Sequence, residues 1–217
     1  DDKLVVFLYQ LVRCRQNLIV SGGTSSGKTT LLNVLSSFIP ARERIVTVED
    51  NAELSLQVRN LVRLEAKPAM AQDPGISMHE LANNALRMRP DRIILGECRG
   101  EEAWDMLLAM NTGHDGSMTT LHSNSAYDSL RRMEAMILRS GLQAPLSMIK
   151  ADIAGTVNFV VHMERLGDGK RRVVEVVEVT GKDGDNYKVS PVFVWSQSNG
   201  FKSTGYVPKF VTTTNHP

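Results

Sequence analysis

Gly22-Gly23-Thr24-Ser25-Ser26-Gly27-Lys28-Thr29 is the stretch that decides the fold, because it matches the phosphate-binding pattern G-x-x-x-x-G-K-[ST] in full. Glycines allow the backbone to wrap closely around a phosphate, and the N–H groups of such a loop point toward the anion. The Lys28 ammonium is expected to reach the β- and γ-phosphates of ATP, and the Thr29 hydroxyl to bind Mg²⁺. We predict that ATP is bound by Gly22, Gly23, Thr24, Ser25, Ser26, Gly27, Lys28, Thr29 and Thr30.

The segments around this loop agree with it. Asn17 to Ser21 is a short apolar run that leads into glycines, as a buried strand does. Strands are predicted at 17–21, 44–49, 61–65, 92–97 and 117–121, and helices at 3–15, 28–37, 77–88, 101–110, 125–140 and 146–156. This alternation predicts an α/β fold with a mostly parallel sheet flanked by helices.

The pattern changes after residue 157. Segments 159–165 and 171–180 alternate apolar and polar residues and are joined by Gly167-Asp168-Gly169, a hairpin signal. A further strand is expected at 192–195, and the polar residues 196–217 are predicted to form an irregular tail. We therefore expect a P-loop core (1–156), a small β-rich C-terminal extension (157–195) packed beside the core or a neighbouring subunit, and a tail (196–217).

Composition limits the possible functions. Hydrophobic residues make up 42% and charged residues 23% of the 217-residue chain, values typical of a folded protein. A net charge of +1 and 6% aromatic residues give no sign of a nucleic-acid channel. The cysteines, Cys14 and Cys98, lack the spacing of a disulfide framework or a zinc site. No apolar run approaches the roughly 20 residues that span a bilayer, so any membrane contact is expected to be peripheral.

Acidic residues follow two of the predicted strands. Glu49 and Asp50 end one strand, with Glu53 just beyond, and Glu97 ends another. Ligands of open α/β sheets bind beyond the carboxyl ends of the strands, so both groups are expected near the nucleotide if their strands neighbour the P-loop strand. The simpler interpretation is that strand ends carry acids because they meet solvent. The P-loop favours the functional interpretation.

Three further segments resemble motifs of the type II/type IV secretion ATPase superfamily. Residues 47–54 (TVEDNAEL) resemble its Asp box, residues 87–100 (RMRPDRIILGECRG) its atypical Walker B segment, and residues 111–122 (NTGHDGSMTTLH) its His box. The order and spacing agree from about residue 4 to residue 195. Within the superfamily, the segments around Arg87 and Asp50 most resemble the Flp (Tad) pilus-assembly ATPases, and the conjugation-type type IV secretion ATPases are the alternative.

The resemblance implies a P-loop NTPase core of the RecA-like class and an ATP-hydrolysing motor. It further implies a homo-hexamer that acts with inner-membrane platform proteins of a pilus or secretion machine. The protein would be cytoplasmic and peripherally associated with the inner membrane. Such motors also carry an N-terminal domain, which this sequence lacks, so we expect an excised or truncated motor domain. No direct nucleic-acid partner is expected.

Roles for single residues follow from the same resemblance. Glu97 would polarise the attacking water, and Glu49, Asp50 and Glu53 would organise Mg²⁺ and water. His114 and His122 would couple the state of the γ-phosphate to the subunit interface. Arg99 would sense nucleotide or a neighbouring subunit.

The remaining histidines, His79, His162 and His216, are interpreted as surface or packed residues. Ser25 stands where many relatives have glycine, and serine fits there if the position does not require a positive φ.

Two other classes of function compete with the motor. A nucleic-acid translocase would show a basic or aromatic channel loop, which the composition does not favour. A nucleotide-gated scaffold would bind ATP and need no water-activating group, and Glu97 argues against it.

Overall fold

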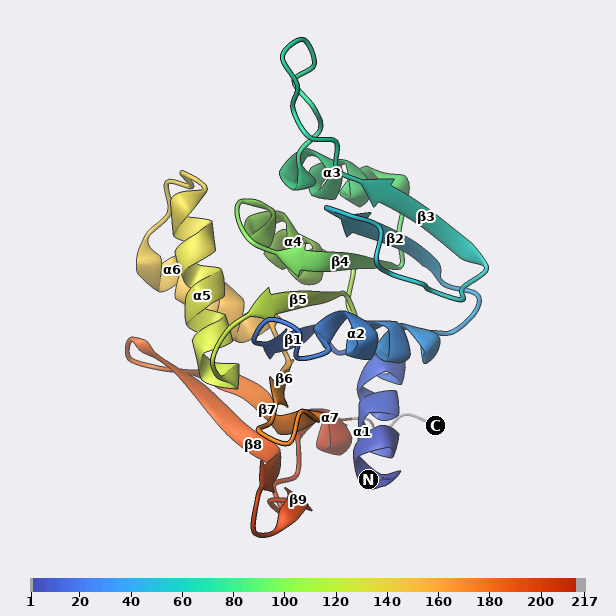
Figure 1. Cartoon of the computed structure of the whole chain (residues 1–217). Helices are drawn as coiled ribbons and strands as arrows, with labels where there is room; N and C mark the ends of the chain where they lie inside the picture. Colours follow the sequence, from blue (N-terminus) through green and yellow to red (C-terminus); the bar gives the residue numbers. More distant parts are fainter. Residues whose placement is uncertain (1, 214–217) are drawn as a thin grey trace.

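The computed structural model describes residues 2–213, and over these residues nine strands join one sheet in the order β3-β2-β4-β5-β1-β6-β7-β8-β9 (Figure 1). The strands are β1 (Leu18–Gly22), β2 (Arg44–Glu49), β3 (Asn60–Glu65), β4 (Arg92–Cys98), β5 (Met118–His122), β6 (Phe159–Arg165), β7 (Arg171–Asp183), β8 (Asn186–Ser196) and β9 (Gly200–Ser203). His216 lies outside the described residues.

The helices follow the predicted alternation with the strands. They are α1 (Asp2–Arg13), α2 (Lys28–Ser37), α3 (Met78–Ala85), α4 (Glu102–Asn111), α5 (Ala126–Arg139), α6 (Leu146–Thr156) and α7 (Lys209–Thr213), with a short 3₁₀ helix at Leu86–Met88. The capping box expected at the start of α3 is present: the Ser77 hydroxyl accepts from the Glu80 N–H, and the Glu80 carboxylate accepts from the Ser77 N–H.

The P-loop strand lies in the middle of the sheet. β1 pairs in parallel with β5 on one side and with β6 on the other, and all of its residues are buried. Central parallel strands covered on both faces are expected to be continuously apolar, as Leu18, Ile19 and Val20 are. The predicted mostly parallel α/β fold is confirmed.

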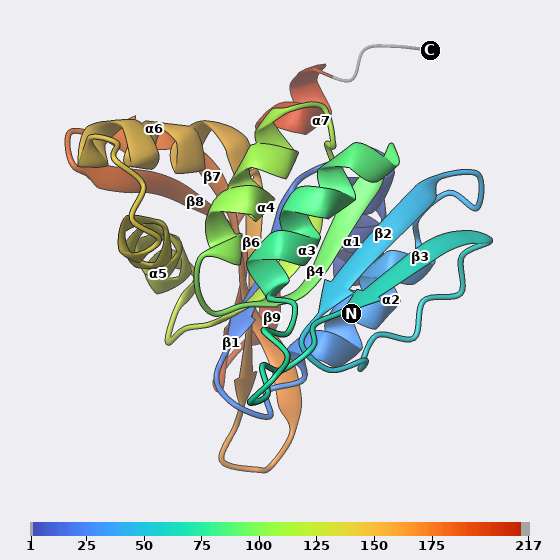
Figure 2. The same cartoon turned by 90° about the horizontal axis from the view of Figure 1, so that it is seen from above.

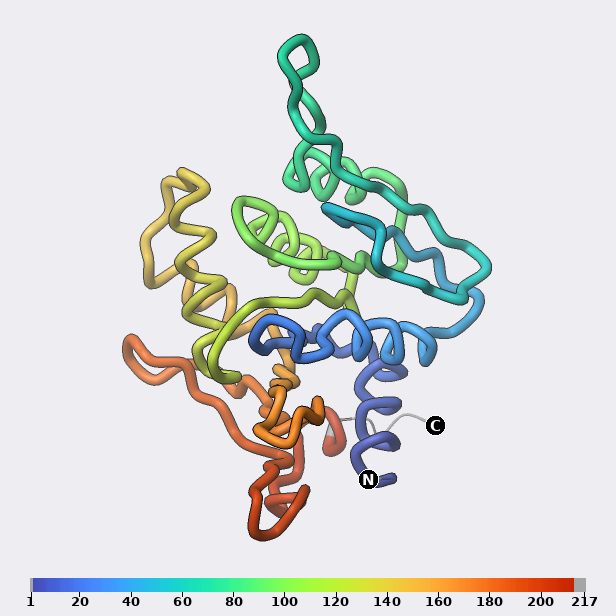
Figure 3. Tube along the Cα trace, in the orientation of Figure 1, coloured from blue at the N-terminus to red at the C-terminus, as the bar shows by residue number. Residues whose placement is uncertain are grey.

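Helices cover both faces of the sheet (Figure 2), and an apolar core lies on each face. Leu18 and Val20 belong to the core that includes residues of α1 and α2, whereas Ile19 belongs to the core formed with α3, α4, α5 and α6. This alternation follows from the two-residue period of a strand. The segment between β3 and α3 projects away from both layers (Figure 3).

The C-terminal strands continue the core sheet. The expected strands of the extension exist and pack beside the core, since β6 pairs directly with β1, and β7 and β8 follow in antiparallel order. β7 and β8 are longer than predicted, reaching Asp183 and Ser196. The sheet thus runs across residue 156 without a break.

The prediction of an irregular tail is wrong for residues 200–203 and 209–213, which form β9 and α7. Phe210 of α7 is buried, with its ring centroid 5.7 Å from that of Phe159 and 6.0 Å from that of Phe7. A few aromatic side chains bury this segment, although serine, threonine and glycine dominate its composition.

A buried ion pair ties together the edge of the sheet where the parallel strands begin. The Arg92 side chain is fully buried and donates to both oxygens of Glu43, at 2.5 and 3.2 Å. Arg92 also donates to the carbonyl oxygen of Val12, 2.8 Å away, and to that of Gly116, 3.4 Å away. One side chain therefore joins β4 to α1 and to the loops before β2 and β5.

None of the helices among residues 2–213 combines the length and the hydropathy that crossing a bilayer requires.

Candidate functional site

The P-loop connects the end of β1 to the start of α2, and two of its glycines are required by its shape. A Cβ on Gly22 would lie 2.3 Å from the carbonyl oxygen of Met163 in β6. Gly27 has a φ of 98° and is the N-cap of α2, where no side chain caps the helix. The first N–H groups of α2 are therefore left for an anion, as the motif predicts.

Ser25 adopts a φ of 57°, in the left-handed region. Serine was expected to fit here without strain only if the position does not require a positive φ. Ser25 does not meet this condition. A Cβ in this region costs on the order of 1–2 kcal/mol. The loop holds its shape at this cost, because strand β1 and helix α2 fix its two ends.

Lys28 is nearly buried and points into the loop. Its Nζ atom donates to the carbonyl oxygen of Gly23 at 3.0 Å and lies 3.4 Å from Nδ1 of His122. Burial lowers the pKa of Lys28, Glu97 acts in the opposite direction, and Arg99 lowers it further. Burial thus disfavours the charged form of Lys28, and a phosphate bound beside the ammonium would stabilise that charge.

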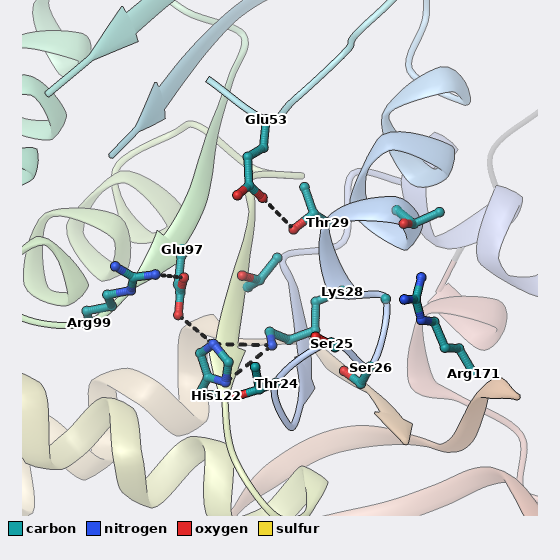
Figure 4. Close-up of a pocket in the computed structure, with 13 residues that line it drawn as sticks. Thr24, Ser25, Ser26, Lys28, Thr29, Glu53, Glu97, Arg99, His122 and Arg171 are labelled. Carbon is teal, nitrogen blue, oxygen red and sulfur yellow. Dashed lines mark hydrogen bonds and ion pairs between the residues drawn. The ribbon is translucent and has the colours of Figure 1, made fainter. Parts of the chain in front are cut away.

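A cavity of about 290 Å³ lies over the P-loop (Figure 4). It is lined by the P-loop and the start of α2 (Thr24, Ser25, Ser26, Gly27, Lys28, Thr29, Thr30) and by Glu53, Glu97, Arg99, Thr120, His122 and Arg171. The site residues thus come from the ends of β1, β4 and β5, from the segment after β2, and from the start of β7. Sheet order explains this, since β4, β5, β1 and β6 are neighbours.

Glu97 projects from β4 into this cavity. Its Oε2 forms an ion pair with the Arg99 guanidinium and lies 2.8 Å from Nη2. Its Oε1 is buried and lies 3.0 Å from Nε2 of His122, at an angle that forms no directed hydrogen bond. Among residues 2–213, Oε1 therefore has no hydrogen-bond donor. The His122 imidazole beside Oε1 and the Arg99 guanidinium beside Oε2 hold the Glu97 carboxylate at the wall of the cavity.

The imidazole of His122 lies between Glu97 and Lys28. Burial lowers its pKa, and the positive charge of Lys28 lowers it further, whereas Glu97 raises it. The net direction is downward, which favours the neutral imidazole at neutral pH. A neutral imidazole offers one donor and one acceptor to its neighbours.

A smaller cavity of about 50 Å³ adjoins the first and is lined by oxygen-bearing side chains, Thr29, Glu49, Asp50, Asn51, Glu53 and Glu97, with Gly96 and Arg99. The Thr29 hydroxyl donates to Oε2 of Glu53 at 3.3 Å. Residues 2–213 contain no group of three or more His, Cys, Asp or Glu side chains that could hold a metal alone. Mg²⁺ in phosphate sites is held by one or two side chains, phosphates and waters, so these residues fit it.

Glu49 lines the smaller cavity and also makes a structural contact that the sequence did not indicate. It is almost fully buried, and its Oε1 accepts from the N–H groups of Glu53 (2.9 Å) and Leu54 (2.7 Å). Glu49 therefore fixes the segment that brings Glu53 to Thr29. These donors bind Oε1 alone, and Glu49 also lines the smaller cavity, so its expected part in organising water stays a prediction.

His114 lies away from the site. It precedes β5, whereas the cavity lies beyond the other end of that strand, roughly 13 Å or more along it. Its Nδ1 is 3.3 Å from the carbonyl oxygen of Ala109 at the end of α4. The direction of β5 thus separates the two ends of the His box within one chain, and the expected coupling of His114 to a subunit interface stays a prediction.

The histidines interpreted as packed or surface residues are involved in structural contacts. His162 is buried and its Nδ1 lies 2.8 Å from the Ser21 hydroxyl, in β1. Burial lowers the pKa of His162. His79 lies 2.6 Å from the buried carboxylate of Asp105, so it joins α3 to α4.

Arg171 is the site residue that sequence reasoning missed. It begins β7 and lies against the P-loop, and a Cβ on Gly27 would be 3.3 Å from its Cδ. The available signal was the basic run Lys170-Arg171-Arg172 after the hairpin. Only the pairing of β6 with β1 reveals that this hairpin reaches the P-loop.

Comparison with known proteins agrees with this geometry. The family described as "Type II/IV secretion system protein" matches residues 1–188. A putative conjugal transfer protein of Mycobacterium tuberculosis is 37% identical over 201 residues, covering 92% of this chain and 56% of that protein. The type IV secretion system protein PtlH of Bordetella pertussis is 40% identical over 183 residues, covering 82% and 53%. The chain thus spans about half the length of these curated relatives.

Solved structures show the same fold. The VirB11 ATPase of the Brucella suis type IV secretion system, in complex with sulphate, superposes with a TM-score of 0.74 at 35% identity, covering 82% of this chain and 52% of that one. The pilus retraction motor PilT with bound ADP has a TM-score of 0.56 at 21% identity, covering 84% and 49%, and shows the fold alone.

Proposed function

The chain belongs to the type II/IV secretion system protein family, and on that premise we propose that it is the ATP-hydrolysing motor of a secretion or pilus-assembly machine. The observation that carries the proposal is the arrangement around one cavity. Lys28 and the uncapped start of α2 form one wall of it, and the Glu97 carboxylate, held by Arg99 and His122, forms another. A phosphate site facing a carboxylate of this kind is suited to hydrolysis rather than to binding alone.

The reaction is the attack of water on the γ-phosphorus of ATP. The bond from this phosphorus to the bridging oxygen breaks, and ADP and inorganic phosphate form. Glu97 orients the water with its carboxylate and accepts its proton. Lys28 and the first N–H groups of α2 stabilise the negative charge on the phosphate oxygens. Neutral His122 can donate to a phosphate oxygen beside Glu97.

Thr29, Glu53 and Asp50 would hold Mg²⁺ beside the phosphates. When bound, Mg²⁺ supplies positive charge that neutralises the β- and γ-phosphate oxygens. Glu49 contributes by holding the segment that carries Glu53. Arg171 packs against Gly27 of the P-loop and would contact a phosphate of the bound nucleotide there.

The kind of machine has two candidates. The motif segments around Asp50 and Arg87 favour Flp (Tad) pilus assembly. The conjugal transfer and type IV secretion relatives support the conjugation-type alternative. We propose a homo-hexamer at the cytoplasmic side of the inner membrane that acts on platform proteins of either machine, without a direct nucleic-acid partner. Co-purification of the full-length protein with pilus or secretion-channel components distinguishes the two.

The decisive experiment measures ATP turnover per subunit against protein concentration, with Glu97→Gln as the control for contaminating activity. We expect turnover that rises with concentration and is lost in the variant, because activity requires both Glu97 and a subunit interface. Nucleotide binding without turnover at any concentration would support the scaffold alternative. Turnover stimulated by nucleic acid would support the translocase.

A further inference from the structure

Glu102 is a buried acid that the proposed reaction does not use directly. It lies in the first turn of α4 and is only 7% exposed. Its Oε1 accepts two backbone hydrogen bonds, from the N–H of Arg99 at 2.5 Å and from that of Gly100 at 2.8 Å. One carboxylate oxygen therefore binds two of the backbone N–H groups in the turn between β4 and α4. Hydrogen bonds to a charged acceptor are stronger than neutral ones.

Helix α4 is a rigid support for this clamp. Ala103, Met106 and Leu107 of α4 are buried in the core on its face of the sheet. Asp105, also buried, lies 2.6 Å from His79 of α3. Contacts that do not involve the turn thus fix the position of α4. The two bonds of Glu102 then hold the turn in place relative to the helix.

The turn carries Arg99, which has little other support. The Arg99 side chain is 65% exposed, so packing does not fix it. Its guanidinium nevertheless lies 2.8 Å from Oε2 of Glu97 and 3.3 Å from Oδ2 of Asp50. The backbone at Arg99 therefore determines whether the guanidinium reaches these carboxylates.

We propose that Glu102 is a positioning residue for ATP hydrolysis, which sets the backbone of the β4–α4 turn so that Arg99 pairs with Glu97. This rests on the proposed ATPase function. Displacing a group in a catalytic arrangement by about 1 Å can cost on the order of 100-fold in rate. We expect Glu102→Gln to lower kcat about tenfold to a hundredfold and to change KM for ATP less than about threefold, because the P-loop is untouched.

The test is a double-mutant cycle on kcat with wild type, Glu102→Gln, Arg99→Ala and the double variant. If Glu102 acts through Arg99, adding Glu102→Gln to Arg99→Ala lowers kcat by less than about twofold. If the two single effects multiply in the double variant, Glu102 acts by another route and the proposal is wrong. Glu101→Gln is the matched control: Glu101 is exposed, makes no side-chain bond to the turn, and should leave kcat unchanged.

Glu102→Asp provides a second variant in case glutamine prevents folding. It keeps the charge but withdraws the carboxylate by one methylene, so it should lower kcat as Glu102→Gln does. Full activity in a folded Glu102→Asp protein would contradict the proposal, because the shortened side chain cannot make both bonds.

A readout independent of turnover separates this proposal from the proposed function. Phenylglyoxal modifies free guanidinium groups, and the rate at Arg99 can be followed by mass spectrometry of its peptide. We expect Glu102→Gln to raise this rate several-fold, with Glu101→Gln matching wild type. An unchanged rate would overturn the positioning role. A wild type without turnover would refute the ATPase proposal, while the Arg99 rate still decides this one.

Discussion

The Arg171 side chain lies across Gly27 of the P-loop, so close that a Cβ on Gly27 would come within 3.3 Å of Cδ of Arg171. Arg171 belongs to a hairpin more than 140 residues further along the chain, and it lines the same cavity as Lys28. The nucleotide cavity thus receives a positive charge from the C-terminal strands of the same chain.

We predict that Arg171→Ala raises the Kd for ATP about tenfold, because one charge-assisted contact to a phosphate contributes about 1.5 kcal/mol. Equilibrium titration with a fluorescent ATP analogue measures the change. Arg172→Ala is the control, since Arg172 pairs with Asp168 and lies over the Trp195 ring instead. Equal losses in both variants would show that Arg171 acts only on stability.

Ser25→Gly should stabilise the protein by about 0.5–1 kcal/mol. The substitution removes the Cβ from a left-handed backbone, and the greater freedom of glycine in the unfolded chain offsets part of that gain. Urea denaturation measures the difference. The neighbouring Ser26 has no positive φ. Ser26→Gly should therefore destabilise, and a loss of stability in both variants would argue against strain at Ser25.

Glu43→Gln should destabilise the protein by about 3 kcal/mol, because it leaves the fully buried Arg92 guanidinium without its carboxylate. Lys67→Ala, which breaks the exposed pair with Asp73, should cost much less, because solvent screens an exposed ion pair. Chemical denaturation compares the two. An Arg92→Met, Glu43→Leu double variant should recover only part of the loss, since the Val12 and Gly116 carbonyls lose their donor.

The pair of His79 and Asp105 should make stability depend on pH. The hydrogen bond to Asp105 raises the pKa of His79, and nearby Glu101 and Glu80 act in the same direction. Burial raises the pKa of Asp105, while His79 lowers it. Since the pKa of His79 is raised on folding, its stabilising effect is present below its unfolded pKa and is lost as pH rises through the folded value.

His79→Ala should therefore cost more unfolding free energy at about pH 6 than at about pH 8.5. Denaturation curves at the two pH values measure this. In an Asp105→Asn background the difference should shrink, because only the weaker effects of Glu101 and Glu80 remain. A cost for His79→Ala that is the same at both pH values would show that the pair contributes packing alone.

Local sequence pattern was enough to predict the strands of the sheet core and the part of the site that lies at the ends of those strands. The P-loop, Glu97, His122 and Glu53 lie together as expected, because each follows a strand that ends at the same edge. His114 could not be placed from its motif, since the motif spans a whole strand and its ends lie at opposite edges. The structural contact of Glu49 could not be predicted, because residue type does not show that backbone N–H groups bind a carboxylate.

Arg171 and α7 were missed for a related reason. Their positions depend on pairing between distant strands and on aromatic contacts, such as that between Phe210 and Phe159, which have no local signature. Long-range pairing of this kind is decided by the whole chain rather than by any one segment.

The insertion of β6 beside β1 has a consequence for the nascent chain. On a ribosome, the P-loop sequence emerges before residues 159–163, and β1 lacks one of its two neighbours until those residues have been synthesised. A Cβ-free Gly22 packed against the Met163 carbonyl has nothing to pack against before then. Because synthesis adds about 5–20 residues per second, ATP cannot find its finished site until several seconds after the loop itself has appeared.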